Sequence, residues 1–151
     1  PGYWNNPDAT AEQWDAKGWF HTGDLGYRDA DGVYFITDRK KDLIIRGGFN
    51  ISPREVEEVI MTHEGVAEAA VIAAHDKRGA EIVKAFVVPR EGVSLDQSEI
   101  IAFCEANMAP YKRPKLVEFV STLPKSATGK VLRTELRGEA TDRRLVTREG
   151  E

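Results

Sequence analysis

The spacing of apolar residues along this chain predicts a series of short strands. Residues 25–28 and 33–37 flank the turn sequence Asp29-Ala30-Asp31-Gly32, a pattern typical of a β-hairpin. Apolar runs at 43–45, 67–74 and 82–88, and an alternating run at 115–120, predict further strands.

Two capping sequences predict helices between these strands. Ser52-Pro53-Arg54-Glu55 combines an N-cap serine, a proline at the first helical position and a glutamate three residues after the serine. Apolar residues then recur at helical spacing, and we expect Gly65 to end this helix. A second helix is expected to begin at Ser94-Leu95-Asp96-Gln97 and to run to about Met108.

The order strand, helix, strand, strand, helix, strand predicts the α+β class, as a small two-layer domain with helices on a mixed or antiparallel sheet. The hairpin segment, residues 1–37, precedes it. A charged linker at 38–42 follows, then the domain itself at 43–137, and a charged tail without periodicity at 138–151.

Composition narrows the class of protein. The chain has 151 residues, of which 41% are hydrophobic and 30% charged, as in soluble globular proteins. The net charge of -4 argues against a nucleic-acid-binding surface, and no apolar run reaches membrane-spanning length. The single cysteine, Cys104, excludes an internal disulfide and a cysteine zinc site and is expected to be a buried thiol. We expect a cytoplasmic protein with no metal site of its own.

The segment Ser126-Ala127-Thr128-Gly129-Lys130 carries the clearest candidate for chemistry. A glycine permits backbone turns that other residues avoid, and a lysine directly after it is a mobile point charge that can reach a phosphate. An ordinary polar turn has the same composition, so this segment alone leaves both interpretations open.

Four motifs in order decide between them: 19–24 (Trp-Phe-His-Thr-Gly-Asp), 38–42 (Asp-Arg-Lys-Lys-Asp), 46–51 (Arg-Gly-Gly-Phe-Asn-Ile) and 124–130. From Pro1 to about Leu136 the chain resembles the C-terminal part of the adenylate-forming enzymes. These are the AMP-forming acyl-CoA synthetases, luciferases and adenylation domains of nonribosomal synthetases. In this family a large N-terminal domain binds ATP and a carboxylic acid, and a small C-terminal domain acts as a lid on a hinge.

The resemblance implies a two-step reaction. The acid and ATP form an acyl-adenylate with release of pyrophosphate, the lid rotates, and a thiol displaces AMP to give a thioester. It also implies that Mg²⁺ accompanies ATP and is bound mainly by the N-terminal domain. Residues 1–37 would then be the end of that domain, with a β-hairpin, and 38–42 the hinge.

Roles in the first step follow by matching motifs. Lys130 corresponds to the catalytic lysine of adenylate formation, and Asp24 and Arg39 to residues that contact the ribose of the nucleotide. Lys41 falls at the hinge position. Other interpretations stay open: Asp24 could cap a turn, Arg39 could pair with a neighbouring aspartate, and Lys41 could lie in a solvated turn.

Roles in the second step are implied for two further segments. Gly47 and Gly48 resemble the loop that lines the pantetheine tunnel, although a tight turn before the helix would equally favour paired glycines. Tyr111, Arg113 and Lys115 match positions that contact the nucleotide of CoA, where basic groups suit phosphate and an aromatic ring can stack on adenine.

The sequence therefore predicts the C-terminal part of an acid–thiol ligase that uses ATP to activate a fatty or other acyl acid and transfers it to CoA. One alternative is an adenylation domain that loads a carrier protein. An alternative of another class is an isolated, non-catalytic lid that only binds CoA. The chain opens at Pro1-Gly2-Tyr3-Trp4 without a methionine, which indicates a fragment of a longer protein. The resemblance implies that the phosphate-binding loop and the acyl pocket lie in the N-terminal domain, so we expect the chain to need that domain as its partner for activity.

Overall fold

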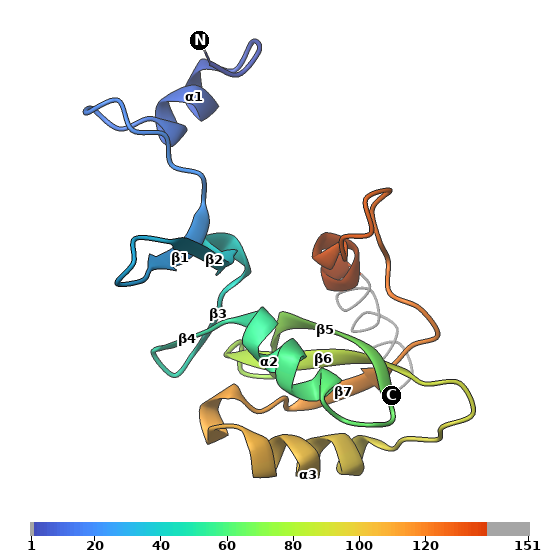
Figure 1. Ribbon diagram of the computed structural model, residues 1–151. Helices are drawn as coiled ribbons and strands as arrows, with labels where there is room; N and C mark the ends of the chain where they lie inside the picture. Colours follow the sequence, from blue (N-terminus) through green and yellow to red (C-terminus); the bar gives the residue numbers. More distant parts are fainter. Residues whose placement is uncertain (1, 139–151) are drawn as a thin grey trace. The chain divides into compact units, whose positions relative to one another are not determined.

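The computed structural model describes residues 2–138, which form two compact units, one ending at Lys41 and the other beginning at Asp42 (Figure 1). Each unit is described by itself. Residues 139–151, almost all of the predicted charged tail, lie outside the described residues.

The first unit contains a helix and a hairpin. Strands β1 (Asp24–Arg28) and β2 (Tyr34–Arg39) pair in antiparallel fashion, which confirms the predicted hairpin. Helix α1 (Pro7–Gln13) is an element that the apolar spacing does not predict. Its signal is the capping pair before it: the Asn6 side chain accepts a hydrogen bond from the Ala9 N–H, and Pro7 opens the helix.

The second unit contains the predicted elements in the predicted order, and it adds strand β4 (Phe49–Ile51) and a helical segment at residues 133–138, which the sequence analysis does not predict. Its elements are β3 (Ile44–Arg46), β4, α2 (Pro53–Met61), β5 (Val66–His75), β6 (Glu81–Pro89), α3 (Gln97–Asn107), the 3-10 helix η2 (Pro110–Lys112) and β7 (Leu116–Phe119). Another 3-10 helix, η1 (Lys40–Asp42), spans the junction of the units. The sheet order is β5-β6-β7, with β5 antiparallel and β7 parallel to β6, so the predicted mixed sheet and α+β class are confirmed.

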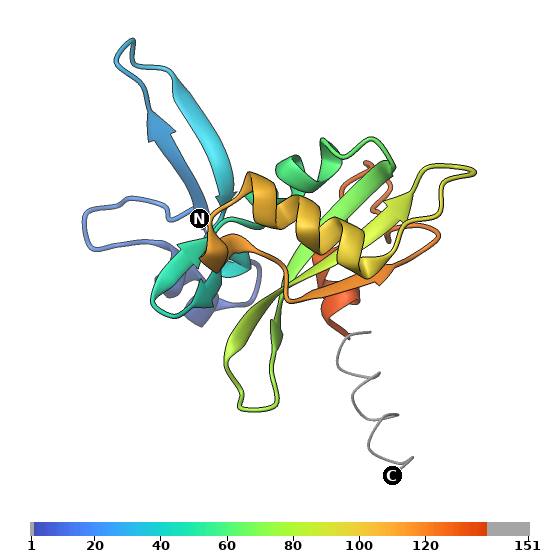
Figure 2. The same ribbon diagram turned by 90° about the horizontal axis from the view of Figure 1, so that it is seen from below.

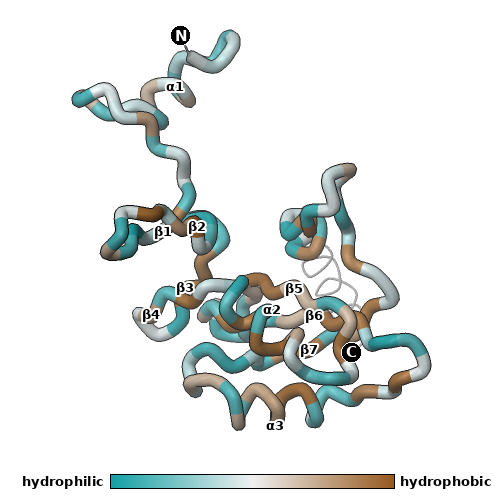
Figure 3. The backbone as a smooth tube through the Cα atoms, in the orientation of Figure 1, coloured by the Kyte–Doolittle hydropathy of each residue, from teal (hydrophilic) through white to brown (hydrophobic). Residues whose placement is uncertain are grey.

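Both faces of this sheet are covered. Helices α2 and α3 pack on one face, where Val56, Ile60, Ile100 and Cys104 meet alternate residues of β5 and β6. Figure 2 shows α3, in gold, running along that face. On the other face, Leu123 and Leu136 from the C-terminal segment pack on Ala70, Ile72 and Phe86. Burial on two sides explains why β5 and β6 are almost continuously hydrophobic (Figure 3).

Cys104 belongs to the helix-covered core and is fully buried, as expected. Loss of hydration raises the pKa of its thiol to about 11. The group is therefore a neutral thiol at neutral pH.

The predicted end of α2 at Gly65 is wrong, because the helix already ends at Met61. Thr62 is the C-cap, and both its N–H and its hydroxyl donate to the Val59 carbonyl, at 3.1 and 2.7 Å. Gly65 has another use: a Cβ at this position would lie 2.8 Å from Cδ2 of Leu95, so the glycine allows close packing.

The cap of α3 lies within the predicted capping segment, residues 94–97. It is Asp96, whose carboxylate accepts hydrogen bonds from the Glu99 N–H at 2.9 Å and the Ser98 hydroxyl at 2.5 Å. These bonds lower the pKa of Asp96, the Ser98 hydroxyl first. Ser94 and Asp96 are both residue types that favour an N-cap position. Asp96 is the cap because its side-chain oxygen accepts from the third N–H of the helix, that of Glu99.

This cap can be tested with a matched pair of variants. Asp96→Ala should lower the urea midpoint of unfolding, because it leaves helix N–H groups without an acceptor. Ser94→Ala should leave the midpoint nearly unchanged. Because the folded-state pKa of Asp96 is lowered, its contribution is present above pH 3.8 and is lost as the pH falls through the lowered value. Urea unfolding followed by circular dichroism at neutral and acidic pH measures both effects, and equal losses for the two variants would contradict the assignment.

Candidate functional site

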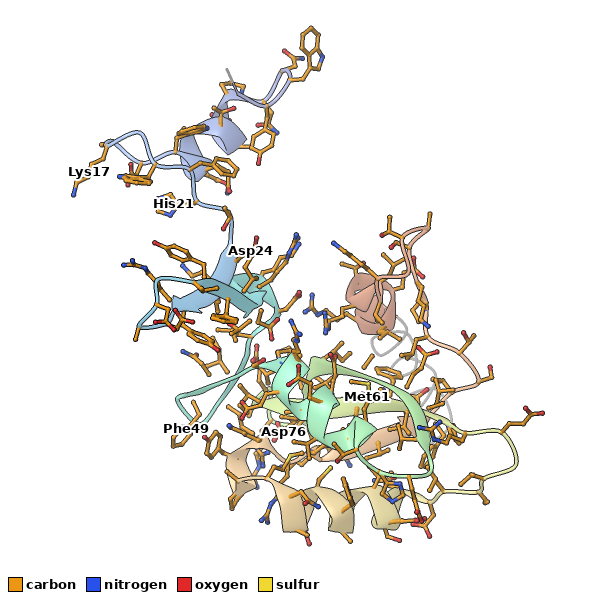
Figure 4. All side chains as sticks on the ribbon, viewed as in Figure 1. Lys17, His21, Asp24, Phe49, Met61 and Asp76 are labelled. Carbon is orange, nitrogen blue, oxygen red and sulfur yellow. The ribbon has the colours of Figure 1, made fainter. Side chains whose placement is uncertain are left out.

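Asp24 and Arg39, the two residues expected to contact a ribose, lie side by side. They are the first residue of β1 and the last of β2, and the strand register places them opposite each other. Nε of Arg39 lies 3.3 Å from Oδ1 of Asp24. Arg39 therefore pairs with Asp24 rather than with Asp38 or Asp42, and both side chains keep solvent-exposed surface. Figure 4 labels Asp24 at the start of β1.

The junction between the units carries one exposed and one buried charge. Lys41, at the predicted hinge position, is exposed. The next residue, Asp42, is only 8% exposed, and its Oδ1 lies 2.7 Å from Nη2 of Arg137. The first residue of the second unit, Asp42, is thus fixed by an ion pair to Arg137 near the other end of that unit. Lys41, directly before it, is exposed to solvent.

The loop that carries Lys130 is a closed turn with an exposed tip. The Ser126 N–H donates to the Lys130 carbonyl at 2.8 Å, and the Ser126 Oγ accepts from the Lys130 N–H at 3.2 Å. Gly129 has φ +79°, which is why a glycine stands before the lysine. Among residues 2–138, no acidic side chain forms an ion pair with the Lys130 ammonium, so its charge is available to a ligand.

The base of this loop is attached to β5, and its two arms are bonded to each other. Before the tip, Nζ of Lys125 lies 2.6 Å from Oε2 of Glu68 on β5. After the tip, the Leu132 N–H donates to the Pro124 carbonyl at 2.8 Å. Buried Leu123 and Leu136 fasten the flanking segments to the core.

Arg133, three residues after Lys130, forms the most buried ion pair of the loop. Its Nη2 lies 2.8 Å from both carboxylate oxygens of Glu57 on α2. Oε1 of Glu57 also accepts from the backbone N–H of Val71 at 2.8 Å. The sequence does not reveal this pair, because its members are 76 positions apart. Its only local signal is the spacing of Arg133 and Arg137, four residues apart in a helical segment.

The paired glycines form the turn between β3 and β4. Arg46 and Phe49 are opposite each other in the ladder, so Gly47 and Gly48 are the two central residues of a hairpin turn. Their φ angles are +58° and +83°, as a type I′ turn requires. No atom lies within 4 Å of a Cβ built at either position, so φ alone accounts for the glycines within the described residues.

This hairpin contacts the segment around Tyr111. The rings of Phe49 and Tyr111 stack with centroids 4.5 Å apart and planes 19° apart. One guanidinium nitrogen of Arg46 donates to the carbonyls of Tyr111 and Arg113, at 3.1 and 3.0 Å. Figure 4 labels Phe49, which is 53% exposed, on β4. The two segments expected to contact CoA therefore form one continuous surface.

The basic residues near Tyr111 have different roles. Arg113 donates to the carbonyls of Met108 and Glu105, at 3.2 and 2.9 Å, so part of its guanidinium caps the C-terminal end of α3. Lys112 is paired with Glu55 on α2, whose carboxylate raises the pKa of the lysine. Lys115 is exposed just before β7. The structure thus leaves Lys115 the most accessible cation of the predicted CoA set.

The Lys130 loop and the β3–β4 hairpin lie in different parts of the second unit (Figures 1 and 2). The described residues therefore present two separate candidate surfaces on one small fold. Among the described residues, no three His, Cys, Asp or Glu side chains come together as metal ligands would, and no helix is long and apolar enough to cross a membrane.

Comparison with known proteins identifies the class. Residues 55–130 match the AMP-binding enzyme C-terminal domain, and the chain belongs to this family. It is 50% identical over 141 residues to a long-chain-fatty-acid–CoA ligase of Bacillus subtilis, covering 93% of this chain and 25% of that protein. It is 46% identical over 138 residues to a 3-[(3aS,4S,7aS)-7a-methyl-1,5-dioxo-octahydro-1H-inden-4-yl]propanoyl:CoA ligase of Rhodococcus jostii, covering 91% of this chain and 27% of that protein.

Solved structures agree with this assignment. The crystal structure of ATP-bound MatB from Rhodopseudomonas palustris matches with a TM-score of 0.88 and 39% identity, over 93% of this chain and 28% of that one. The resemblance to the C-terminal domain of adenylate-forming enzymes is confirmed. The chain spans about a quarter of the length of the relatives that it matches.

The glycine turn leads to a stability prediction. Gly48→Ala should destabilise the second unit by about 1–2 kcal/mol, because a side chain at positive φ is strained even in open space. Gly48→Asn should cost clearly less, since asparagine tolerates this region. Urea unfolding of the two variants measures the difference. Equal losses would mean that something other than φ selects the glycine.

Proposed function

We propose that this chain is the C-terminal part of an ATP-dependent acid–CoA ligase that forms an acyl-adenylate and then an acyl-CoA thioester. The observation that carries the proposal is the Lys130 ammonium, which stands on a closed loop without an acidic partner among the described residues. The names of the relatives, CoA ligases at 44–50% identity, support CoA rather than a carrier protein as the acceptor.

In the first step, Lys130 would stabilise charge on phosphate oxygens. When a carboxylate attacks the α-phosphate of ATP, like charges approach each other and pyrophosphate must leave. A preorganised donor at such a position is typically worth about 2.7–4 kcal/mol of transition-state stabilisation. In the first unit, the Asp24 carboxylate can accept hydrogen bonds from two vicinal ribose hydroxyls, with Arg39 as the second contact.

In the second step, the hairpin surface would receive CoA. Gly47 and Gly48 place no side chain on the turn, which allows a narrow pantetheine arm to approach the backbone. Tyr111, already stacked on Phe49, offers a ring to the adenine, and Lys115 and the remaining donors of Arg113 suit its phosphates. Lys41 would lie at the hinge about which the lid rotates between the two steps.

Most of the substrate binding would take place outside this chain. The carboxylic acid, ATP and its Mg²⁺ would bind mainly to an N-terminal domain upstream of Pro1, and we assign no metal ligand to the chain itself. We propose a cytoplasmic location, because the one cysteine of this chain is a free, buried thiol.

Replacing the loop lysine tests the proposal in the parent enzyme. Lys130→Ala should lower the rate of adenylate formation by at least about 100-fold, because a preorganised donor is lost. Thioester formation from preformed adenylate should change little. ATP–pyrophosphate exchange and single-turnover transfer to CoA measure the two steps, with Lys77→Ala, an exposed lysine in the β5–β6 turn, as the control. Equal loss of both steps would contradict the assigned role.

The chain by itself should behave as a non-catalytic lid. We expect no ATP–pyrophosphate exchange from it and weak binding of CoA in isothermal titration. Binding of a carrier protein without binding of CoA would favour the carrier-loading alternative, and robust exchange would refute the assignment to the lid.

A further inference from the structure

We propose that Arg133 and Glu57 are positioning residues that hold the Lys130 loop in place through the edge of the β-sheet. The inference rests on the proposed role of Lys130. Neither residue is expected to touch a substrate. Their effect is to fix where the lysine stands on the lid.

Glu57 joins three parts of the fold at one carboxylate. It projects from α2, is 8% exposed, and accepts a hydrogen bond from the Val71 N–H at 2.8 Å. Val71 lies in β5, an outer strand of the three-stranded sheet, so this N–H is a strand-edge donor that needs an acceptor. The same carboxylate holds Arg133 through two 2.8 Å contacts. Through Glu57, Arg133 is therefore held against strand β5 rather than against an exposed side chain.

Arg133 lies close enough to Lys130 in the chain for its ion pair to restrict the position of the lysine. Only Val131 and Leu132 separate it from Lys130, and the bonds of the closed turn leave these residues little freedom. The other end of the loop is also attached to β5, through Lys125 and Glu68. That second pair is 38% and 40% exposed, so it is the weaker of the two attachments.

A role in stability alone does not require this arrangement. Replacing a buried ion pair by apolar residues is often neutral for folding, because desolvation of the charges offsets their attraction. The contact of Nη2 with both oxygens of the Glu57 carboxylate instead fixes how far the guanidinium lies from α2. Positioning a charge matters more for catalysis than for folding, since a displacement of about 1 Å can cost about 100-fold in rate.

The test uses the full-length parent enzyme and separates the half-reactions. Arg133→Met should slow adenylate formation about 10- to 100-fold and change thioester formation from preformed adenylate by less than about 3-fold. Arg133→Lys keeps one charged nitrogen that can contact the Glu57 carboxylate, as Nη2 of Arg133 does, and should restore part of the lost rate. The matched control is Arg54→Met, which removes an exposed pair with Glu58 on the same helix α2 and should change neither step.

Each result distinguishes the positioning role from simpler ones. A parallel loss of both half-reactions would show that Arg133 only keeps the lid folded, and a rate like that of Arg54→Met would show that it does not position the loop. If Arg133→Met fails to fold, Arg133→Lys and Glu57→Gln are compared instead. A selective loss of adenylate formation supports the proposal, and its absence refutes it. Lys130→Ala in the same assay is the reference: normal adenylation by that variant would refute the proposed function itself.

Discussion

The carboxylate of Glu57 is the point on which much of the second unit depends. A sheet edge leaves backbone N–H groups without partners, and Glu57 satisfies that of Val71 while it holds Arg133. Helix α2, strand β5 and the C-terminal segment therefore meet at one buried charge. Taking away either partner would leave a charged group in a poorly hydrated place, which typically costs several kcal/mol.

Around that point the fold keeps the two candidate surfaces apart on a small scaffold. The sheet is covered by helices on one face and by the C-terminal segment on the other, so segments from opposite faces can serve different chemistry. The Lys130 loop is supported by β5, whereas the glycine turn is supported by β3 and by the stacked Tyr111. This separation supports the proposal of a lid that presents a different surface in each of two steps.

Much of the architecture follows from local pattern. The hairpin, helices α2 and α3 and the strands of the three-stranded sheet are where apolar spacing and capping residues predict them. The differences are the unpredicted strand β4, the unpredicted helical residues 133–138, and the end of α2, where Thr62 caps the helix before Gly65 is reached. Helix α1 has a capping signal but no buried residue, so its apolar pattern is too weak to predict it.

The sequence by itself determined the family, the class of fold and the residues matched to its motifs, because motif order and hydrophobic period are local properties of the chain. Only the tertiary structure decided which charges meet. Arg39 pairs with Asp24, Asp42 with Arg137, and Glu57 with Arg133. The last two pairs are 95 and 76 positions apart. An ion pair is defined by distance in space, and no periodicity along the chain encodes a contact that only the packing of α2, β5 and the C-terminal segment creates.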